Sequence, residues 1–358
     1  MSSLRSAALI LVLATSCGEP IESFAVEYDD STSTRFSGQT MRLESGVILA
    51  EGQWSFWYPN GQMQALGCFM DGKVPSVEKN GLTRITHAGR SGSWTFWDPS
   101  GNKESQGTYK NGKRHGQWSF WFADGALRQR GEFEDGSESG MHFSWHASGE
   151  LASRGMFFRG ARSGVHETFD DLGILRTSCL YRDGMIDGAF TRWDENSVRR
   201  ELADYRAGEL YGTRTLWDEE GNLFWVGDYE RGMQEGRDTL YHSNGKVRQE
   251  GRHIAGRQVG ELTAWDKDGH KAWTYEYNGG KPDGLRTSWY PSGTLRSQGS
   301  FEGGLPVADH IQWFRSGDKM SEGGYKNGVR SGLWKYWTLE GRLVETESGE
   351  YLAGALQR

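Results

Sequence analysis

The sequence of 358 residues contains little proline, little cysteine and no long apolar run. Seven Pro and three Cys cannot supply a proline-rich linker system or a disulfide framework. No apolar stretch approaches the ~20 residues that a helix needs to span a bilayer. The mean hydropathy is −0.71, which is low for a compact globule of this length. These shortages favour a thin structure over a single thick core.

The charge balance is acidic, with 41 Lys and Arg against 48 Asp and Glu. The formal net charge is −7, and no block of basic residues interrupts the chain. Nucleic-acid binding requires a basic stripe or patch, so a nucleic-acid partner is not expected. The same balance disfavours attraction to anionic lipid headgroups.

What the chain has in abundance is glycine and tryptophan, with 51 Gly and 16 Trp, and they recur at a fixed interval. A unit seen clearly at 116–139 returns every 24 residues. An earlier copy opens at Gly52, out of step, and Ala308 fills one register that lacks glycine. A period of this size indicates an array of repeats. The in-phase copies open at Gly92, Gly116, Gly140, Gly164, Gly188, Gly212, Gly236, Gly260, Gly284 and Gly332.

Each unit is a predicted β-hairpin. Counting the opening glycine as position 1, positions 10 and 21 are almost always Gly, often after Asp or Asn, as in Asn111-Gly112 and Asp135-Gly136. Such pairs tolerate positive φ and are the strongest short-range hairpin signal. Two turns per unit leave two strands of about six residues. We therefore expect an all-β fold, an elongated single-layer array of antiparallel β-hairpins with about 12 copies.

The core of this array is predicted from the aromatic positions. Position 6 is aromatic in every in-phase copy, as in Trp97, Trp121 and Trp217. Because residues required in every copy usually pack, we expect these rings to stack into a continuous core. Position 16 is usually Gly, as in Gly131, and we expect it to leave room for a Trp ring from a neighbouring strand.

The first 51 residues are predicted to lie ahead of the first clear copy, and Met41–Ala50 alternates enough to begin pairing as a strand. Residues 1–16 resemble a signal peptide, with Arg5 before the short apolar run Ala7–Leu13. Ala14-Thr15-Ser16-Cys17 resembles a bacterial lipobox, which implies lipidation of Cys17, and the following Gly18 implies transfer to the outer membrane. An ordinary cleaved signal peptide is the alternative. The domains expected are the signal peptide 1–16, a lipidated acidic tether 17–51 and the array 52–358, with 76–91 as a degenerate unit.

This organisation places the protein in the cell envelope, lipid-anchored, on a periplasmic or surface face that the sequence leaves open. Cys68 and Cys179 lie several copies apart, on the order of 40 Å in an extended array. A disulfide requires Cα atoms within about 7 Å. We therefore expect two free thiols.

The recurring pattern resembles MORN repeats. It runs over residues 52–354 and is closest to the bacterial variant found in proteins labelled as YwqK-family antitoxins. The resemblance implies a hairpin array that serves as a scaffold, a dimerisation surface or a lipid contact. A lipid anchor fits poorly with a cytoplasmic antitoxin. One copy shows the pattern as Gly116, Trp118, Phe120, Trp121, Gly125, Gly131, Phe133 and Gly136.

No catalytic constellation is found in the sequence, so we expect a protein that is not an enzyme and has no catalytic residues, no cofactor and no metal. His142 and His146 would lie ~13 Å apart on a strand and are expected at the surface. Acidic turns such as Asp135-Gly136 lack the alternating ligands of a calcium loop. No phosphate-binding or nucleophile motif occurs between a strand and a helix.

The candidate binding surface lies at positions 3 and 5, which vary along the chain. They are aromatic in early copies and mostly polar or aliphatic in the middle ones. An exposed aromatic patch marks an interaction surface; the alternative is an end cap that covers the rings. The partner is then an envelope protein, with a polysaccharide or an antitoxin-like or immunity role as the other hypotheses. The six candidate rings are Trp54, Phe56, Trp94, Phe96, Trp118 and Phe120.

Overall fold

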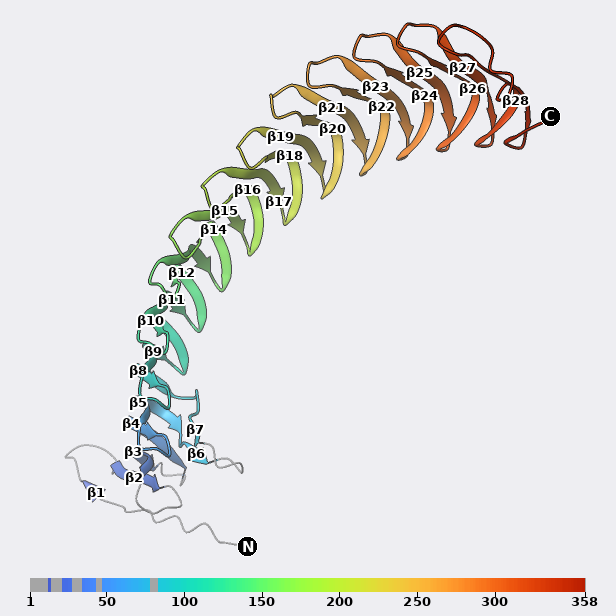
Figure 1. The fold of residues 1–358 in the computed structure, drawn as a ribbon. Helices are drawn as coiled ribbons and strands as arrows, with labels where there is room; N and C mark the ends of the chain where they lie inside the picture. Colours follow the sequence, from blue (N-terminus) through green and yellow to red (C-terminus); the bar gives the residue numbers. More distant parts are fainter. Residues whose placement is uncertain (1–11, 14–20, 28–33, 43–46, 78–82, 358) are drawn as a thin grey trace. The chain divides into compact units, whose positions relative to one another are not determined.

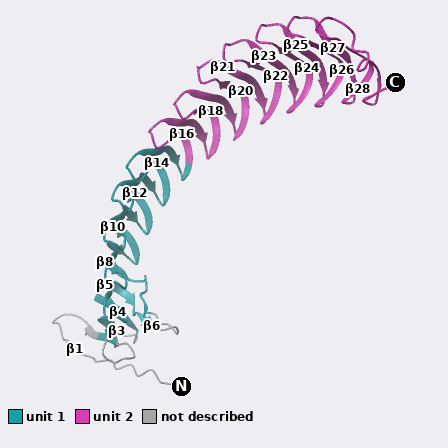
Figure 2. Ribbon diagram, viewed as in Figure 1, with its two compact units in different colours: residues 1–185 teal, residues 186–358 magenta. Residues whose placement is uncertain are grey.

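The computed structural model describes residues 12–13, 21–27, 34–42, 47–77 and 83–357 (Figure 1). The chain divides into two compact units, residues 1–185 and 186–358 (Figure 2). Cys17 and most of the predicted signal peptide lie outside the described residues, so their assignments stay predictions.

Every described secondary-structure element is a strand. The first unit contains β1 Val12–Leu13, β2 Ile21–Glu27, β3 Thr34–Arg42, β4 Ile48–Trp57, β5 Met63–Lys73, β6 Ser76–Val77, β7 Thr83–Arg84, β8 Arg90–Trp97, β9 Lys103–Lys110, β10 Lys113–Trp121, β11 Leu127–Glu134, β12 Ser137–Trp145, β13 Leu151–Phe158, β14 Ala161–Phe169 and β15 Leu175–Arg182. The second contains β16 Met185–Trp193 (which starts on the last residue of the first unit), β17 Arg199–Arg206, β18 Glu209–Trp217, β19 Leu223–Glu230, β20 Met233–Tyr241, β21 Val247–Ile254, β22 Arg257–Trp265, β23 Lys271–Asn278, β24 Lys281–Trp289, β25 Leu295–Glu302, β26 Leu305–Trp313, β27 Lys319–Lys326, β28 Val329–Tyr336, β29 Gly349–Leu352 and β30 Ala355–Leu356.

Within each unit, strands that follow one another along the chain pair antiparallel in a single layer, with one exception described below. The tight turns have the predicted chemistry: Asn111 and Gly112 both have positive φ, at 51° and 75°, and so do Asp135 and Gly136. That geometry matches the twist of the paired strands. The single-layer antiparallel hairpin array expected from the sequence is confirmed.

The predicted tether is partly wrong, because β2 and β3 form a further hairpin ahead of the first recognised copy. Phe24 pairs with Gly38, and β3 pairs with β4, so this hairpin extends the sheet. Phe36 is buried at 1% exposure in the common core. The strand β1, inside the predicted signal peptide, pairs with β2.

Residues 76–91 are not a degenerate unit of the array. β5 pairs directly with β8, whereas β6 and β7 pair with each other in a separate two-stranded sheet. This is the exception to sequential pairing. Arg90 and Ser91 already belong to β8 in the array, and the part of the segment before them is an insertion between two copies.

The pairing register defines the two faces of the sheet. In the copy that opens at Gly116, the opening glycine pairs with Phe133, Trp118 with Gly131 and Phe120 with Gln129. Paired residues point to the same side of a sheet, so positions 1, 3, 5, 14, 16 and 18 share one face. We call this the ladder face and the opposite one the outer face. The buried core cluster of the first unit lies on the ladder face.

Candidate functional site

The six candidate rings at positions 3 and 5 lie on the ladder face, and the structure does not expose them. Trp54, Phe56, Trp94 and Trp118 are 0% exposed. Phe96 and Phe120 are half-buried and pack against the same core cluster. The expectation of an exposed aromatic patch is therefore wrong for Trp54, Phe56, Trp94 and Trp118, and Phe96 and Phe120 belong to the edge of the core.

Stacking between consecutive strands covers these rings. Trp118 packs edge-on against Tyr109 at 4.9 Å between centroids and stacks on Phe120 at 6.0 Å. Its indole Nε1–H donates a hydrogen bond to the Thr108 carbonyl at 3.0 Å. The guanidinium of Arg114 lies 4.7 Å from the Trp118 ring centroid and covers the stack from above. A ring enclosed on all sides in this way is core and offers no surface to a partner.

Position 6, which was predicted to form the core, lies on the outer face instead. Trp121 and its equivalents are half-buried. Cations lie beside these rings: Lys103 Nζ is 5.1 Å from the Trp121 centroid, and Arg199 is 5.5 Å from Trp217. The assignment was wrong because alternation puts position 6 on the face opposite positions 3 and 5, and the register pairs those two positions with Gly131 and Gln129. The constant ring of the repeat is thus an outer ring.

The predicted role of the glycine at position 16 is confirmed, although the ring above it belongs to position 3. A Cβ built on Gly107 would lie 2.3 Å from Trp118 Cδ2, and one on Gly67 would lie 2.0 Å from Trp94. Such distances leave no space for any side chain. The same relation holds where position 3 is His: a Cβ on Gly131 would meet His142 Nδ1 at 2.1 Å.

The ladder changes composition in the copies that open at Gly140 and Gly164, formed by β12–β13 and β14–β15. At position 3, His142 and His166 replace Trp, and at position 5, Ser144 and Thr168 replace Phe. His142, expected at the surface, is 5% exposed. His142 Nε2 lies 2.8 Å from the Glu132 carbonyl, so it donates the hydrogen bond that a Trp makes elsewhere. Histidine therefore keeps this hydrogen bond, but its ring is smaller than the indole that it replaces.

These smaller side chains leave a groove of about 860 Å³ on the ladder face, which we call the ladder groove. Its floor carries two hydroxyl pairs, each 2.6 Å apart: Ser144 with Ser153, and Thr168 with Thr177. Volumes of this size are typical of ligand sites. The remaining lining includes Gln129, His142, Phe157, His166, Cys179 and Tyr181.

Four charged side chains, two of each sign, also line the groove: Glu138, Arg154, Arg162 and Glu167. Burial lowers the pKa of His166, with a smaller contribution from nearby Arg162, so the imidazole is neutral at pH 7. Arg162 Nη1 donates to the Tyr181 hydroxyl at 3.1 Å. Burial raises the pKa of the Cys179 thiol, which keeps it protonated. Cys68 and Cys179 are both free, as predicted.

The outer face of the same two copies carries exposed apolar side chains. Met141 pairs with Met156 across β12 and β13, and Val165 pairs with Leu180 across β14 and β15. Phe158 lies two residues along β13 from Met156, on the same face. Equivalent pairs in other copies are polar, such as Gln117 with Glu132 and Arg237 with Arg252. We call Met141, Met156, Phe158, Val165 and Leu180 the outer apolar patch; each is between 36% and 58% exposed.

The ladder face of the second unit is charged. Glu201 is 7% exposed and lies between two arginines, 3.2 Å from Arg192 Nε and 2.8 Å from Arg214. Burial alone would lower the pKa of Arg214, but its hydrogen bond to Tyr229 and the charge of Glu201 raise it. A buried charge costs several kcal/mol unless it is paired. This triad replaces aromatic stacking in its copy with an ion-pair network.

A smaller polar pair lies further along the same face of the second unit. Asp238 Oδ1 is 3.0 Å from His253 Nδ1, and both side chains are largely buried. They occupy positions 3 and 18, where other copies place Trp and an aromatic ring. The pair therefore takes the place of an aromatic contact in the ladder.

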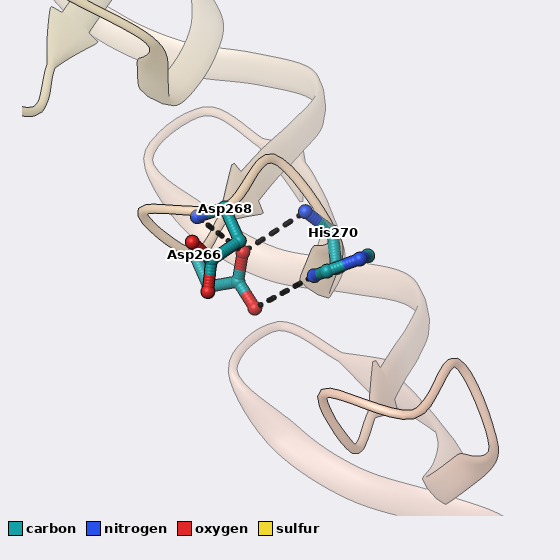
Figure 3. Close-up of side chains that lie close together, drawn as sticks. All are labelled: Asp266, Asp268 and His270. Atoms are coloured by element: carbon teal, nitrogen blue, oxygen red, sulfur yellow. Dashed lines mark hydrogen bonds and ion pairs between the residues drawn. The ribbon is translucent and has the colours of Figure 1, made fainter. Parts of the chain in front are cut away.

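Three potential metal ligands meet at one turn of the second unit, Asp266, Asp268 and His270 (Figure 3). Asp266 Oδ1 accepts the backbone N–H of Asp268 and of His270, each at 2.9 Å. These hydrogen bonds, chiefly that from His270, lower the pKa of Asp266. Asp98 makes the same two bonds at the equivalent turn, to Ser100 and Asn102. Turn chemistry therefore accounts for the cluster.

Within the part of the chain that the structure describes, there is no helix of the length and apolarity needed to cross a membrane. Sequence reasoning missed the residues of the ladder groove, although a signal was present. Positions 3 and 5 depart from the aromatic pattern at His142, Ser144, His166 and Thr168, and those departures mark the groove.

Comparisons with solved structures give weak likenesses. The crystal structure of a GtfA/B complex bound to UDP and GlcNAc is 14% identical over 31% of this chain and 22% of that chain, with a TM-score of 0.15. A TcdB2-TccC3-Cdc42 structure is 11% identical over 95% of this chain and 24% of that chain, with a TM-score of 0.17. This chain thus spans less than a quarter of the length of either, and neither likeness carries an argument about function.

No curated protein matches the chain. A family model described as a MORN repeat variant matches three segments, residues 50–71, 90–111 and 282–302. The first two segments belong to β4–β5 and β8–β9, and the third to β24–β25. All three follow the hairpin register of the array. These three segments of the array match the MORN repeat variant, which the recurring glycines and aromatic residues resemble.

Proposed function

We propose that this protein is a non-enzymatic scaffold of the bacterial cell envelope that binds another protein through the outer apolar patch. The hairpin repeats and the absence of a catalytic motif in the sequence support a scaffold. The proposed envelope location and lipid anchor come from the sequence pattern that ends at Cys17.

The observation that carries the proposal is the exposure of five large apolar side chains on adjacent strands. Contiguous apolar patches on a soluble surface usually mark interaction sites. Met141 lies opposite Met156, and the register shift between Gly155 and Met156 places Val165 in a bulge beside that pair. Methionine adapts its shape to a partner, which suits a binding surface.

The rim of the patch favours a protein partner. Arg154 and Glu167 form an ion pair on the neighbouring outer positions, and Glu132 borders the patch on β11. Arg159 lies 5.1 Å from the centroid of the Phe158 ring. An apolar centre inside a polar rim of both signs is the usual anatomy of a protein interface. Anionic lipid is disfavoured by the acidic residues at the rim and by the net charge of −7.

A photo-crosslinking amino acid at position 156 tests the proposal in the full-length protein in its own envelope. We expect a discrete crosslink to one envelope protein, which is lost when Val165→Thr and Leu180→Gln are added. The same probe at Ile254, which is 47% exposed on the outer face of the second unit, is the control and should give no such product. Binding of the purified partner must then show the same dependence.

Two results would contradict the proposal. One is a crosslink pattern at position 156 that does not change in the double variant. The other is a crosslink to a second copy of this chain, accompanied by a dimer in sedimentation that the double variant dissociates. The first removes the patch as a binding surface, and the second replaces the partner by self-association.

A further inference from the structure

The ladder groove is a second surface, on the opposite face of the same two copies, and the outer patch does not explain it. It is built on five consecutive strands, β11 to β15. Gln129, Ser144, Ser153, Thr168 and Thr177 form one continuous row of pairs across these strands. Neighbouring members are therefore ~4.8 Å apart.

The groove exists because this row loses its aromatic rings. One copy earlier, Phe120 pairs with Gln129, and before that Phe96 pairs with Ser105. Ser144 and Thr168 occupy the same position as those two phenyl rings. The phenyl stack therefore ends at Phe120, and the two copies that follow leave space above the sheet that core packing would have filled.

The floor of the groove offers unused hydrogen-bonding capacity. In each hydroxyl pair one O–H donates to the other oxygen, at 2.6 Å. The second hydroxyl keeps its own hydrogen, and both oxygens keep acceptor capacity. Each pair can therefore give and accept one further hydrogen bond without breaking its internal contact.

A second row of residues, His142, Phe157, His166 and Tyr181, supplies flat rings. His166 Nε2 lies 2.7 Å from the Met156 carbonyl, so it carries the proton and donates it there. The ring of His142 packs against Phe157 at 4.8 Å between centroids, and that of His166 packs against Tyr181 at 4.9 Å. The groove thus combines hydroxyls on its floor with aromatic edges on its wall.

We propose that the ladder groove binds a neutral polysaccharide chain that runs across the strands, with every second sugar on a hydroxyl pair. A sugar has hydroxyls at its rim and C–H groups on its faces, which match the floor and the wall. The two hydroxyl pairs repeat every two strands, ~10 Å apart. That is about the length of two sugar rings, so both pairs meet equivalent sugars of one polymer.

An extended peptide fits this spacing poorly, because its side chains return to one face every ~6.7 Å. A polyproline II peptide returns every ~9.3 Å and would match the repeat. Such peptides, however, dock between exposed aromatic ridges, whereas the repeating groups here are hydroxyls. The sugar is favoured for that reason, and the proline-rich peptide becomes an outcome of the test.

The test is calorimetric titration of the full-length purified protein with cellohexaose, maltohexaose and mannohexaose. We expect at least one hexasaccharide to bind. The matching disaccharide reaches one hydroxyl pair only, so its affinity should be lower by a factor of at least about 10. Ser144→Phe with Thr168→Phe should weaken binding about 30-fold, the equivalent of ~2 kcal/mol for two lost hydrogen bonds. This variant restores the residue type of Phe96 and Phe120, so the fold has a precedent for it.

Ser93→Phe is the matched control, because it adds the same ring at an exposed outer position of β8. It should leave the affinity unchanged. Circular dichroism and hydrogen exchange establish that both variants are folded. The inference is overturned if none of the three hexasaccharides binds at millimolar concentration, or if the groove variant binds as well as the wild type. Binding of a polyproline peptide or a uronic-acid polymer in place of these sugars overturns it too. The inference stands apart from the proposed protein partner, since Val165→Thr with Leu180→Gln leaves the groove lining intact.

Discussion

Trp118 and Trp121 lie three residues apart on β10, and replacing each by alanine separates the two faces of the sheet. Trp118 is fully buried on the ladder face, and Trp121 is half-buried on the outer face. Buried Trp→Ala substitutions cost about 3–5 kcal/mol. The Trp118 indole also loses its hydrogen bond to Thr108, worth ~1 kcal/mol within that total. We expect about 4 kcal/mol for Trp118→Ala.

Trp121→Ala should cost only about 1–2 kcal/mol, because part of its ring is already in water and its contact with Lys103 is exposed. Native-state hydrogen exchange of the amides in β9–β11 measures both values locally, which is preferable to global melting because repeat arrays unfold in parts. Trp118→His should recover ~1 kcal/mol relative to alanine, since His142 shows that an imidazole makes the same bond. An equal or greater cost for Trp121→Ala would refute the assignment of the faces.

Two further predictions follow from the same packing. Gly107→Ala should destabilise β9–β10 by about 1–3 kcal/mol, because the new Cβ would lie 2.3 Å from Trp118 Cδ2. Nearly all of that cost should vanish when Trp118 is also replaced by alanine. A double-mutant cycle measured by hydrogen exchange would contradict the contact if the two costs simply add. The pKa of His166 is lowered in the folded protein by burial, so the unfolded chain binds more protons below pH 6.5. The free energy of local unfolding of β13–β15 should therefore be highest above pH 6.5 and fall as the pH drops below that value. In His166→Asn, the amide hydrogen exchange of these strands should lose this pH dependence.

The sequence predicted the architecture because the repeat carries its own turn chemistry. Pairs such as Asn111-Gly112 set the hairpins, and the 24-residue period showed that they were equivalent. The structure of two segments was not predicted, because insertions interrupt the 24-residue period there. The hairpin of β2 and β3 is separated from the Gly52 copy by a longer connection, and residues 76–91 add a side hairpin between two ladder strands.

The faces were predicted the wrong way round for a physical reason. Alternation along a strand gives two faces but does not say which is buried, and it puts Trp121 on the face opposite Trp118 and Phe120. The constancy of the ring at position 6 predicts a core position, but the structure buries the other face. The decisive signal was the coupling of Gly107 to Trp118, since only the face with room for a close ring needs a glycine.

The candidate site shows the same inversion. Positions 3 and 5 vary along the sequence, and the aromatic residues at these positions are the predicted binding surface. In the structure those aromatics, such as Trp94, are core, and the polar replacements, such as Ser144, open the groove. Which neighbours a substituted ring leaves uncovered depends on cross-strand packing, and the strand pattern alone does not contain that information.

The most direct test of the account is solvent exchange of the tryptophan indole N–H groups, resolved by nuclear magnetic resonance on ¹⁵N-labelled protein. We expect slow exchange for Trp54, Trp94, Trp118 and Trp334, whose Nε1–H groups donate to backbone carbonyls beneath the stack. The outer rings Trp97, Trp121 and Trp217 should exchange fast. Slow exchange at these outer rings together with fast exchange at Trp118 would contradict the claim that the ladder face is the core.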